Sequence, residues 1–237
     1  MGNIFTPRVS GKRELSLATE KLNEGKLEEA LELTKHALAI IRKKGDQQEI
    51  SYVNGRILEI QANLSKNQGD VTNAARAFGQ SALHYSQAQK QKEMNRVTII
   101  YVDLLLEMGR EFAEMQKFDK AASNFEEASI AYKTLGLEID SMEVKAKAYI
   151  FRAASVKNLA DRKVFLLKAV DLFKQSGMDH PLVLGHAQYY TAMVEKFHDK
   201  EQAIRRLDNA IDFYKQANND SMIVTARLLQ NQLRENQ

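Results

Sequence analysis

Five histidines are the side chains of this sequence best able to bind a metal or to move a proton near neutral pH. A metal site on a helix needs two ligands on one face, typically four residues apart. His180 and His186 are the nearest two, and their spacing of six residues turns them to different sides of a helix. The chain has no cysteine, so it has no thiolate ligand or nucleophile. We therefore predict no metal site. The five are His36, His84, His180, His186 and His198.

Carboxylates are plentiful, but they occur as direct neighbours, as in Glu28-Glu29 and Glu126-Glu127. Adjacent residues on a helix point about 100° apart, so such a pair cannot act as acid and base on one substrate. The sequence also lacks a Walker-type phosphate loop, a G-x-G-x-x-G loop and a G-x-S-x-G elbow. We expect no enzymatic activity and no small-molecule cofactor.

The N-terminus contains the most specific short motif. Its first six residues fit the M-G-x-x-x-[ST] pattern for myristoylation of Gly2. One acyl chain binds a membrane weakly, and Arg8, Lys12 and Arg13 could supply the basic second signal that a stable anchor needs. Two interpretations stay open: a lipidated N-terminus in peripheral contact with a membrane, or an ordinary flexible tail over residues 1–11.

The charge of the chain does not favour nucleic acid as a partner. Its net charge of +3 is small, although the isoelectric point is about 8.9. Lys and Arg are balanced by nearby acids, and the aromatic residues occupy helix-core positions instead of alternating with basic ones. The longest apolar stretch, Val97–Met108, is interrupted by Asp103 and is too short to span a membrane. We expect a soluble protein, and the absence of cysteine favours the cytoplasm.

Helical periodicity runs through almost the whole chain, and Pro and Gly are scarce: 2 and 11 of 237 residues. Apolar residues recur at steps of three and four, and no sustained alternation predicts a strand. Glycines after the helical runs, such as Gly25 and Gly69, predict helix C-termini. The expected helices pair as 12–24 with 27–44, 47–67 with 70–90, 93–115 with 118–135, 138–159 with 161–176 and 181–197 with 199–217, followed by a helix at 221–235.

Three second helices share a short pattern: a small residue, an aromatic residue four positions later and then Lys. The small residues are Ala128, Ala169 and Ala210, and they are 41 residues apart both times. Repeats of 20–50 residues are typical of helical hairpins stacked into a solenoid. The sequence therefore predicts an all-α solenoid of about five antiparallel hairpins and a terminal helix; the alternative is an irregular helical bundle.

The hairpins resemble the tetratricopeptide repeat. The best copy has the apolar and small residues of that repeat at its signature spacing, with Gly109 where two helices pack closely. Repeats of 41 to 47 residues instead of 34 resemble the long-repeat members of the superfamily, among them the soluble NSF attachment proteins, the kinesin light chains and the bacterial peptide-sensing regulators. The residues that carry this likeness are Leu105, Met108, Gly109, Phe112, Phe118, Ala121, Phe125 and Ala128.

The resemblance implies one right-handed repeat domain over 12–237. It also implies that the helix at about 221–235 caps the last hairpin. Its apolar residues Met222, Val224, Leu228 and Leu229 suggest the covering face.

In such a solenoid the first helix of each hairpin lines the concave surface. The exposed positions of the first helices are then candidates for binding a peptide or helical segment, because Asn can bond a peptide backbone and Arg and Lys can bind a carboxylate. The candidate partner-binding residues are Arg56, Glu59, Asn63, Lys66, Asp103, Arg110, Glu114, Lys147, Gln188 and Glu195.

The function that this pattern favours is a non-enzymatic adaptor or scaffold for a protein or peptide partner. Two alternatives remain open: a vesicle-fusion or trafficking adaptor that resembles the soluble NSF attachment proteins, and a nucleic-acid-associated or peptide-sensing regulator.

Overall fold

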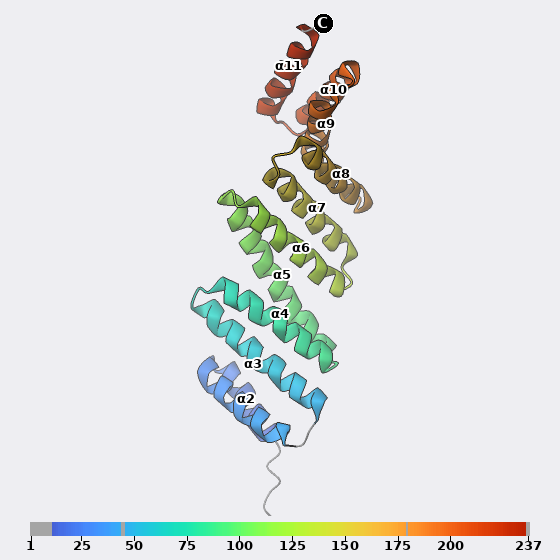
Figure 1. Ribbon diagram of the computed structural model, residues 1–237. Coiled ribbons are helices and arrows are strands. Elements are labelled where there is room, and N and C mark those ends of the chain that lie inside the picture. Colours follow the sequence, from blue (N-terminus) through green and yellow to red (C-terminus); the bar gives the residue numbers. More distant parts are fainter. Residues whose placement is uncertain (1–10, 44–45, 179, 236–237) are drawn as a thin grey trace, which may run out of the picture. The chain divides into compact units, whose positions relative to one another are not determined.

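The computed structural model describes residues 11–43, 46–178 and 180–235, and every regular element within these ranges is a helix (Figure 1). Only a few residues separate one helix from the next, and neighbouring helices pack on one another within each unit. This arrangement confirms the predicted all-α solenoid. The helices are α1 Lys12–Asn23, α2 Leu27–Arg42, α3 Gln47–Asn67, α4 Val71–Gln87, α5 Gln91–Glu114, α6 Phe118–Thr134, α7 Glu138–Ser155, α8 Leu159–Gln175, α9 Pro181–Glu195, α10 Lys200–Gln216 and α11 Asp220–Glu235.

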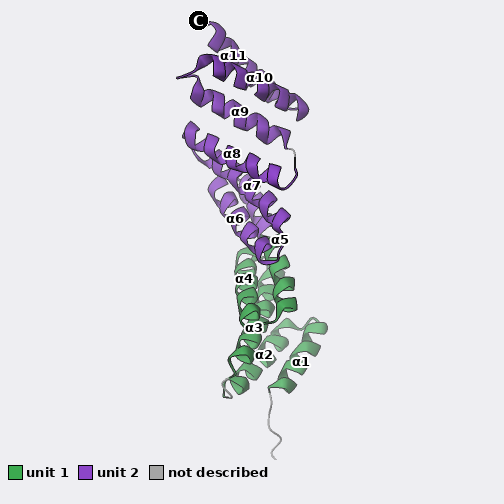
Figure 2. Ribbon diagram, turned by 90° about the vertical axis from the view of Figure 1, so that its right-hand side faces the viewer, with its two compact units in different colours: residues 1–104 green, residues 105–237 purple. Residues whose placement is uncertain are grey.

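The chain forms two compact units (Figure 2). Unit 1 comprises residues 1–104 and unit 2 comprises residues 105–237, so the long helix α5 contributes its first part to unit 1 and its last part to unit 2. In unit 1, α2 packs on α1 and α3, and α3 packs on α4. In unit 2, each helix from α6 to α11 packs on the next. That residues 12–237 are a single domain stays a prediction.

The helix ends follow from local sequence. Gly69 ends α3 in the left-handed region, at a φ of 77°, as the sequence predicts. Asp70 then begins α4, because its carboxylate accepts the backbone N–H of Asn73 at 3.1 Å. No glycine marks the end of α5, where Gln116 itself takes the left-handed conformation at a φ of 57°.

The fourth hairpin corrects an expected boundary. Its first helix, α7, ends at Ser155 instead of 159, since Val156 is extended. The Asn158 side chain accepts the backbone N–H groups of Ala160 and Asp161, so α8 begins at Leu159 and not at 161. The break between the two helices was expected, but it lies a few residues earlier, because Asn158 caps α8 where the apolar pattern alone would continue α7.

The terminal helix α11 packs on α10, as expected, but only two of the four apolar residues predicted to cover the last hairpin do so. Met222 and Leu229 pack against the core of the last hairpin, whereas Val224 and Leu228 are 55% and 60% exposed. Two residues along a helix turn a side chain by about 200°, which carries Val224 away from the face of Met222. The buried face is completed by Ala226, Gln230 and Leu233.

Repeated contacts between a glycine and an aromatic ring set the distance between the helices of a hairpin. A Cβ atom at Gly109 would lie 2.7 Å from the Phe125 ring, so this glycine allows the close packing expected for it. The structure adds two contacts that the sequence analysis missed, Gly55 against Tyr85 and Gly185 against Tyr214. In each case the aromatic ring of the second helix lies on the backbone of the first.

Candidate functional site

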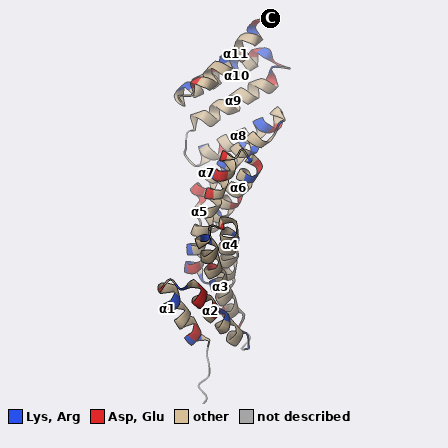
Figure 3. Ribbon diagram, turned by 90° about the vertical axis from the view of Figure 1, so that its left-hand side faces the viewer, with Lys and Arg blue, Asp and Glu red and all other residues tan. Residues whose placement is uncertain are grey.

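The predicted partner-binding residues divide between the two units. Arg56, Glu59, Asn63 and Lys66 lie on α3 of unit 1, and Asp103 lies on the part of α5 in unit 1. The others belong to unit 2: Arg110 and Glu114 on α5, Lys147 on α7, and Gln188 and Glu195 on α9. Charged residues of both signs occur along both units (Figure 3).

Glu59 is occupied by partners from neighbouring helices of unit 1. Its carboxylate accepts the Tyr85 hydroxyl at 2.7 Å and pairs with both terminal nitrogens of Arg96, at 2.7 and 2.8 Å. The Glu59 side chain is only 18% exposed, and burial beside this carboxylate raises the pKa of the Tyr85 hydroxyl far above its usual value. These contacts join α3 to α4 and α5, so the Glu59 carboxylate stabilises the packing of helices within unit 1.

Arg56 and Asn63 also have partners within the chain. An Arg56 Nη atom donates to the Thr19 hydroxyl at 2.9 Å, which ties α3 to α1. Asn63 donates to the backbone carbonyl of Glu59, one turn earlier on the same helix, at 2.9 Å. Both side chains are half-buried, whereas Lys66 and Asp103 are exposed. Of the four predicted binding residues on α3, only Lys66 therefore has a fully exposed side chain.

Gln188 and Glu195 contact α10 in the same manner. Arg206 donates to Glu195 at 3.3 Å and to Gln188 at 3.2 Å. Lys163 of α8 lies 3.8 Å from the other oxygen of Glu195. Gln188 therefore stabilises the α9–α10 hairpin, whereas Glu195 also joins this hairpin to α8 of the preceding one, as Glu59 joins two hairpins in unit 1.

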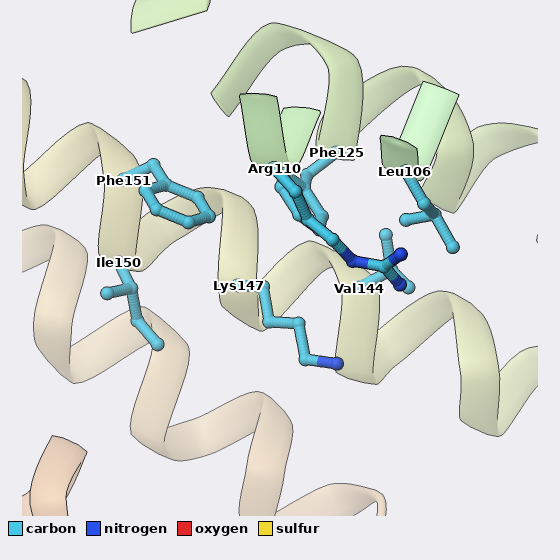
Figure 4. Close-up of a pocket in the computed structure, with 7 residues that line it drawn as sticks. All are labelled: Leu106, Arg110, Phe125, Val144, Lys147, Ile150 and Phe151. Atoms are coloured by element: carbon cyan, nitrogen blue, oxygen red, sulfur yellow. The ribbon is translucent and has the colours of Figure 1, made fainter. Parts of the chain in front are cut away.

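Arg110 and Lys147 are brought together at a pocket of about 260 Å³ in unit 2 (Figure 4). Arg110 comes from α5 and Lys147 from α7, and Figure 4 shows the Arg110 guanidinium at Val144 and the Lys147 ammonium below it. Both side chains are exposed, and neither forms an ion pair with any residue that the structure describes. Glu114, also predicted, is exposed on α5 and does not line the pocket.

The interior of this pocket is apolar. The rings of Phe125 and Phe151 stack with centroids 5.1 Å apart, and α5 and α7 add aliphatic side chains. The sequence analysis found the two cations but not these residues, because they belong to core faces of three separate helices. The apolar lining consists of Leu106, Phe125, Val144, Ile150 and Phe151.

His186 contributes to the core of unit 2. His186 Nδ1 lies 3.0 Å from the Tyr214 hydroxyl, and burial lowers the pKa of its imidazole. Burial likewise raises the pKa of Tyr214 far above its usual range.

Within residues 11–43, 46–178 and 180–235, no three His, Asp or Glu side chains gather closely enough to hold a metal ion. The helices in the same ranges include none long and apolar enough to cross a membrane. Gly2 lies outside the described residues.

Comparisons with known proteins identify no family for this chain. No family model matches it, and no curated protein matches it. Among solved structures, it is similar to the complex of the TPR2AB domain of yeast Sti1 with an HSP90 peptide, described as "TPR2AB-domain:pHSP90-complex of yeast Sti1". The identity is 14% and the TM-score 0.29, over 94% of this chain and 98% of the other. A likeness this distant says nothing about a partner. The class that the fold itself defines is an α-solenoid.

Proposed function

We propose that this protein is a non-enzymatic adaptor that binds a segment of a protein partner at the Arg110–Lys147 pocket of unit 2. The observation that carries the proposal is the combination of two unpaired cations with an apolar interior. The Arg guanidinium can bind a carboxylate through two parallel hydrogen bonds, and the Lys ammonium adds a second positive charge. The volume of about 260 Å³ suits one large apolar side chain.

The partner segment that fits is acidic and apolar. A carboxylate would pair with Arg110 and Lys147 at the rim, and a neighbouring aliphatic or aromatic side chain would pack against Phe151 and the aliphatic lining. This geometry favours recognition over catalysis, because the only titratable groups that line the pocket are two cations, which offer no general base.

A peptide-binding measurement tests this function. The ligand is a fluorescent peptide selected from a random display library on the full chain, and each Asp or Glu in it is then replaced by its amide. We expect one such replacement, and equally the variant Arg110→Gln/Lys147→Gln, to weaken binding about tenfold or more. Added salt should weaken binding as well.

The matched control is Lys145→Gln. Lys145 is also exposed on α7, but it lies two residues from Lys147 and so points to another side of the helix. Equal loss of affinity in Lys145→Gln and in the double variant would show a general charge effect and no pocket. Binding that ignores both the amide replacements and the double variant would also contradict the proposal.

Several finer expectations remain proposals of the sequence alone. They are a cytoplasmic location, contact of the N-terminus with a membrane, and a role in vesicle trafficking. The pocket favours none of the three.

A further inference from the structure

The outward face of α4, in unit 1, differs from the other second helices in its charge. Within residues 71–87, all of which the structure describes, Arg76 is the one exposed charged side chain. The other exposed residues are amide and hydroxyl side chains and Leu83. By contrast, the exposed faces of α2, α6, α8 and α10 bear charges of both signs. In Figure 3 the ribbon of α4 is accordingly almost entirely tan.

This composition is unusual for a helix face in contact with water. Such faces are normally rich in Lys, Glu and Asp. The cores of protein interfaces are depleted in these three residues and retain Arg. Leu83 is 66% exposed, so the face also offers apolar surface to a partner. The contrast with the other second helices indicates a contact surface on α4.

A hollow of about 400 Å³ lies beside this face, between α3 and α4. Gln61 of α3 and Gln80 of α4 line its two walls, and Leu58 and Leu64 add apolar surface. Ser65, a further lining residue, is nine residues from Arg56, which is half a turn around α3. The hollow therefore lies on the side of α3 opposite Arg56, away from the α3 residues that the sequence predicts on the concave surface.

Arg76 lines this hollow and has a free guanidinium. Among the residues that the structure describes, it has no ion-pair partner. The nearby carboxylate of Asp70 is occupied, because it accepts the backbone N–H of Asn73 at 3.1 Å and its side-chain amide at 2.5 Å. These hydrogen bonds, with a smaller contribution from Arg76, lower the pKa of Asp70. A carboxylate from outside the chain could accept hydrogen bonds from the guanidinium of Arg76.

We propose that the α4 face, defined by Arg76, Gln80, Leu83 and Gln87 with Gln61 across the hollow, docks an amphipathic α-helix of a protein partner. The four α4 residues follow one stripe over three turns, roughly 16 Å, and a groove beside two antiparallel helices is suited to a third. The glutamines each donate and accept hydrogen bonds, and Leu83 contacts an apolar residue. The partner helix is uncharged on its contact face except for one carboxylate, which pairs with Arg76.

The proposal is tested with a display library of helical peptides about five turns long, roughly 18 residues, whose contact face is randomised. Selection uses the full chain, and affinities are measured with the purified peptides. We expect the selected helices to contain one essential Asp or Glu and to bind Arg76→Glu and Leu83→Glu about tenfold more weakly or worse.

The matched control is Ile130→Glu. Ile130 stands twelve residues after the first residue of α6, as Leu83 does after that of α4, and it is 68% exposed on a face that carries charges. We expect Ile130→Glu, and the pocket variant Arg110→Gln/Lys147→Gln, to bind the selected helices like the unchanged chain. Both α4 substitutions are at exposed positions, so circular dichroism should show unchanged helicity.

Three outcomes would overturn the proposal. The first is a selection that yields no helix whose binding depends on a carboxylate. In the second, the selected helices bind Leu83→Glu as tightly as the unchanged chain. The third is a concentration-dependent dimer, seen by sedimentation, that Leu83→Glu abolishes, because it would assign the α4 face to a second copy of this chain. None of these results bears on the pocket of unit 2, which has its own ligand and variants.

Discussion

Polar residues on the first helices have two opposite roles, and a site in each unit illustrates one of them. In unit 1, Glu59 is surrounded by partners, with Arg96 and the Tyr85 hydroxyl all within 2.8 Å. In unit 2, Arg110 and Lys147 line an apolar pocket and have no carboxylate partner among the described residues. The sequence analysis assigned all three residues the same role. The comparison shows that the partners supplied by neighbouring helices, and not the position within the repeat, decide whether a polar side chain stabilises the fold or is free to bind a ligand.

The largest expected effect comes from removing the central carboxylate of unit 1. Glu59→Ala leaves the buried Tyr85 hydroxyl without its acceptor and Arg96 without its counter-ion. We expect unit 1 to lose about 2 kcal/mol or more of its unfolding free energy. Hydrogen exchange resolved by mass spectrometry should show faster exchange in α3 and α4, with α9 and α10 as the internal reference.

A double-mutant cycle separates the Tyr85 contact from other effects of Glu59→Ala. Tyr85→Phe removes only the hydroxyl, so Glu59→Ala in that background should cost less than in the unchanged chain. Purely additive losses would show that the hydrogen bond does not couple the two residues, and the contrast with unit 2 would then be weaker than the geometry indicates.

The next effect compares the glycines on which tyrosine rings lie. A Cβ atom would be 2.7 Å from the Tyr214 ring at Gly185 but 3.0 Å from the Tyr85 ring at Gly55. We expect Gly185→Ala to destabilise unit 2 by about 1–2 kcal/mol, the cost of overpacking less the gain in helix propensity. Gly55→Ala should be closer to neutral. Denaturant unfolding of the two variants tests the order, and a larger loss at Gly55 would contradict it.

The helices themselves could be predicted from the sequence because their signals are local. Apolar residues at steps of three and four define each helix, and glycines such as Gly25 and Gly69 end them at positive φ, as expected. The misjudged end of α7 depends on Asn158, which caps a helix within an apolar run. Such local features require only the residues on either side of a boundary.

The candidate site was harder to predict because it depends on which side chains meet from different helices. Arg110 and Lys147 were found, but the Phe125–Phe151 pair beside them belongs to faces that read only as core. Glu59 was expected to be free because Arg96 is 37 residues away and its approach depends on how α3 and α5 pack. The sequence describes each helix face, whereas the pairing of faces is a property of the packed structure.

A smaller effect concerns pH and again separates the units. Burial holds the pKa of His186 in folded unit 2 below its ordinary value of 6.5. The unfolded chain therefore binds a proton more readily, so this contribution to stability is complete above about pH 6.5 and is lost as the pH falls toward the lowered native value. We expect α9 and α10 to exchange hydrogen faster, relative to α3 and α4, at mildly acidic pH.

The control for the pH effect is His186→Gln, which keeps a hydrogen-bonding partner for the Tyr214 hydroxyl but does not titrate. Its α9–α10 exchange, corrected for the intrinsic pH dependence of exchange, should change less with pH than that of the unchanged chain. An identical pH response in both proteins would assign the effect to another group.

The smallest expected effect on stability is at the pocket, and it is the sharpest test of the comparison. Arg110→Ala/Lys147→Ala removes two exposed cations that have no ion-pair partner within the described part of the chain, so the unfolding free energy should stay within about 0.5 kcal/mol of the unchanged value. Binding of the selected acidic peptide should nevertheless be lost. A stability loss above about 1 kcal/mol would mean that these cations stabilise unit 2 as Glu59 stabilises unit 1. The pocket residues would then not differ from Glu59, whose hydrogen-bonding groups are occupied within the fold.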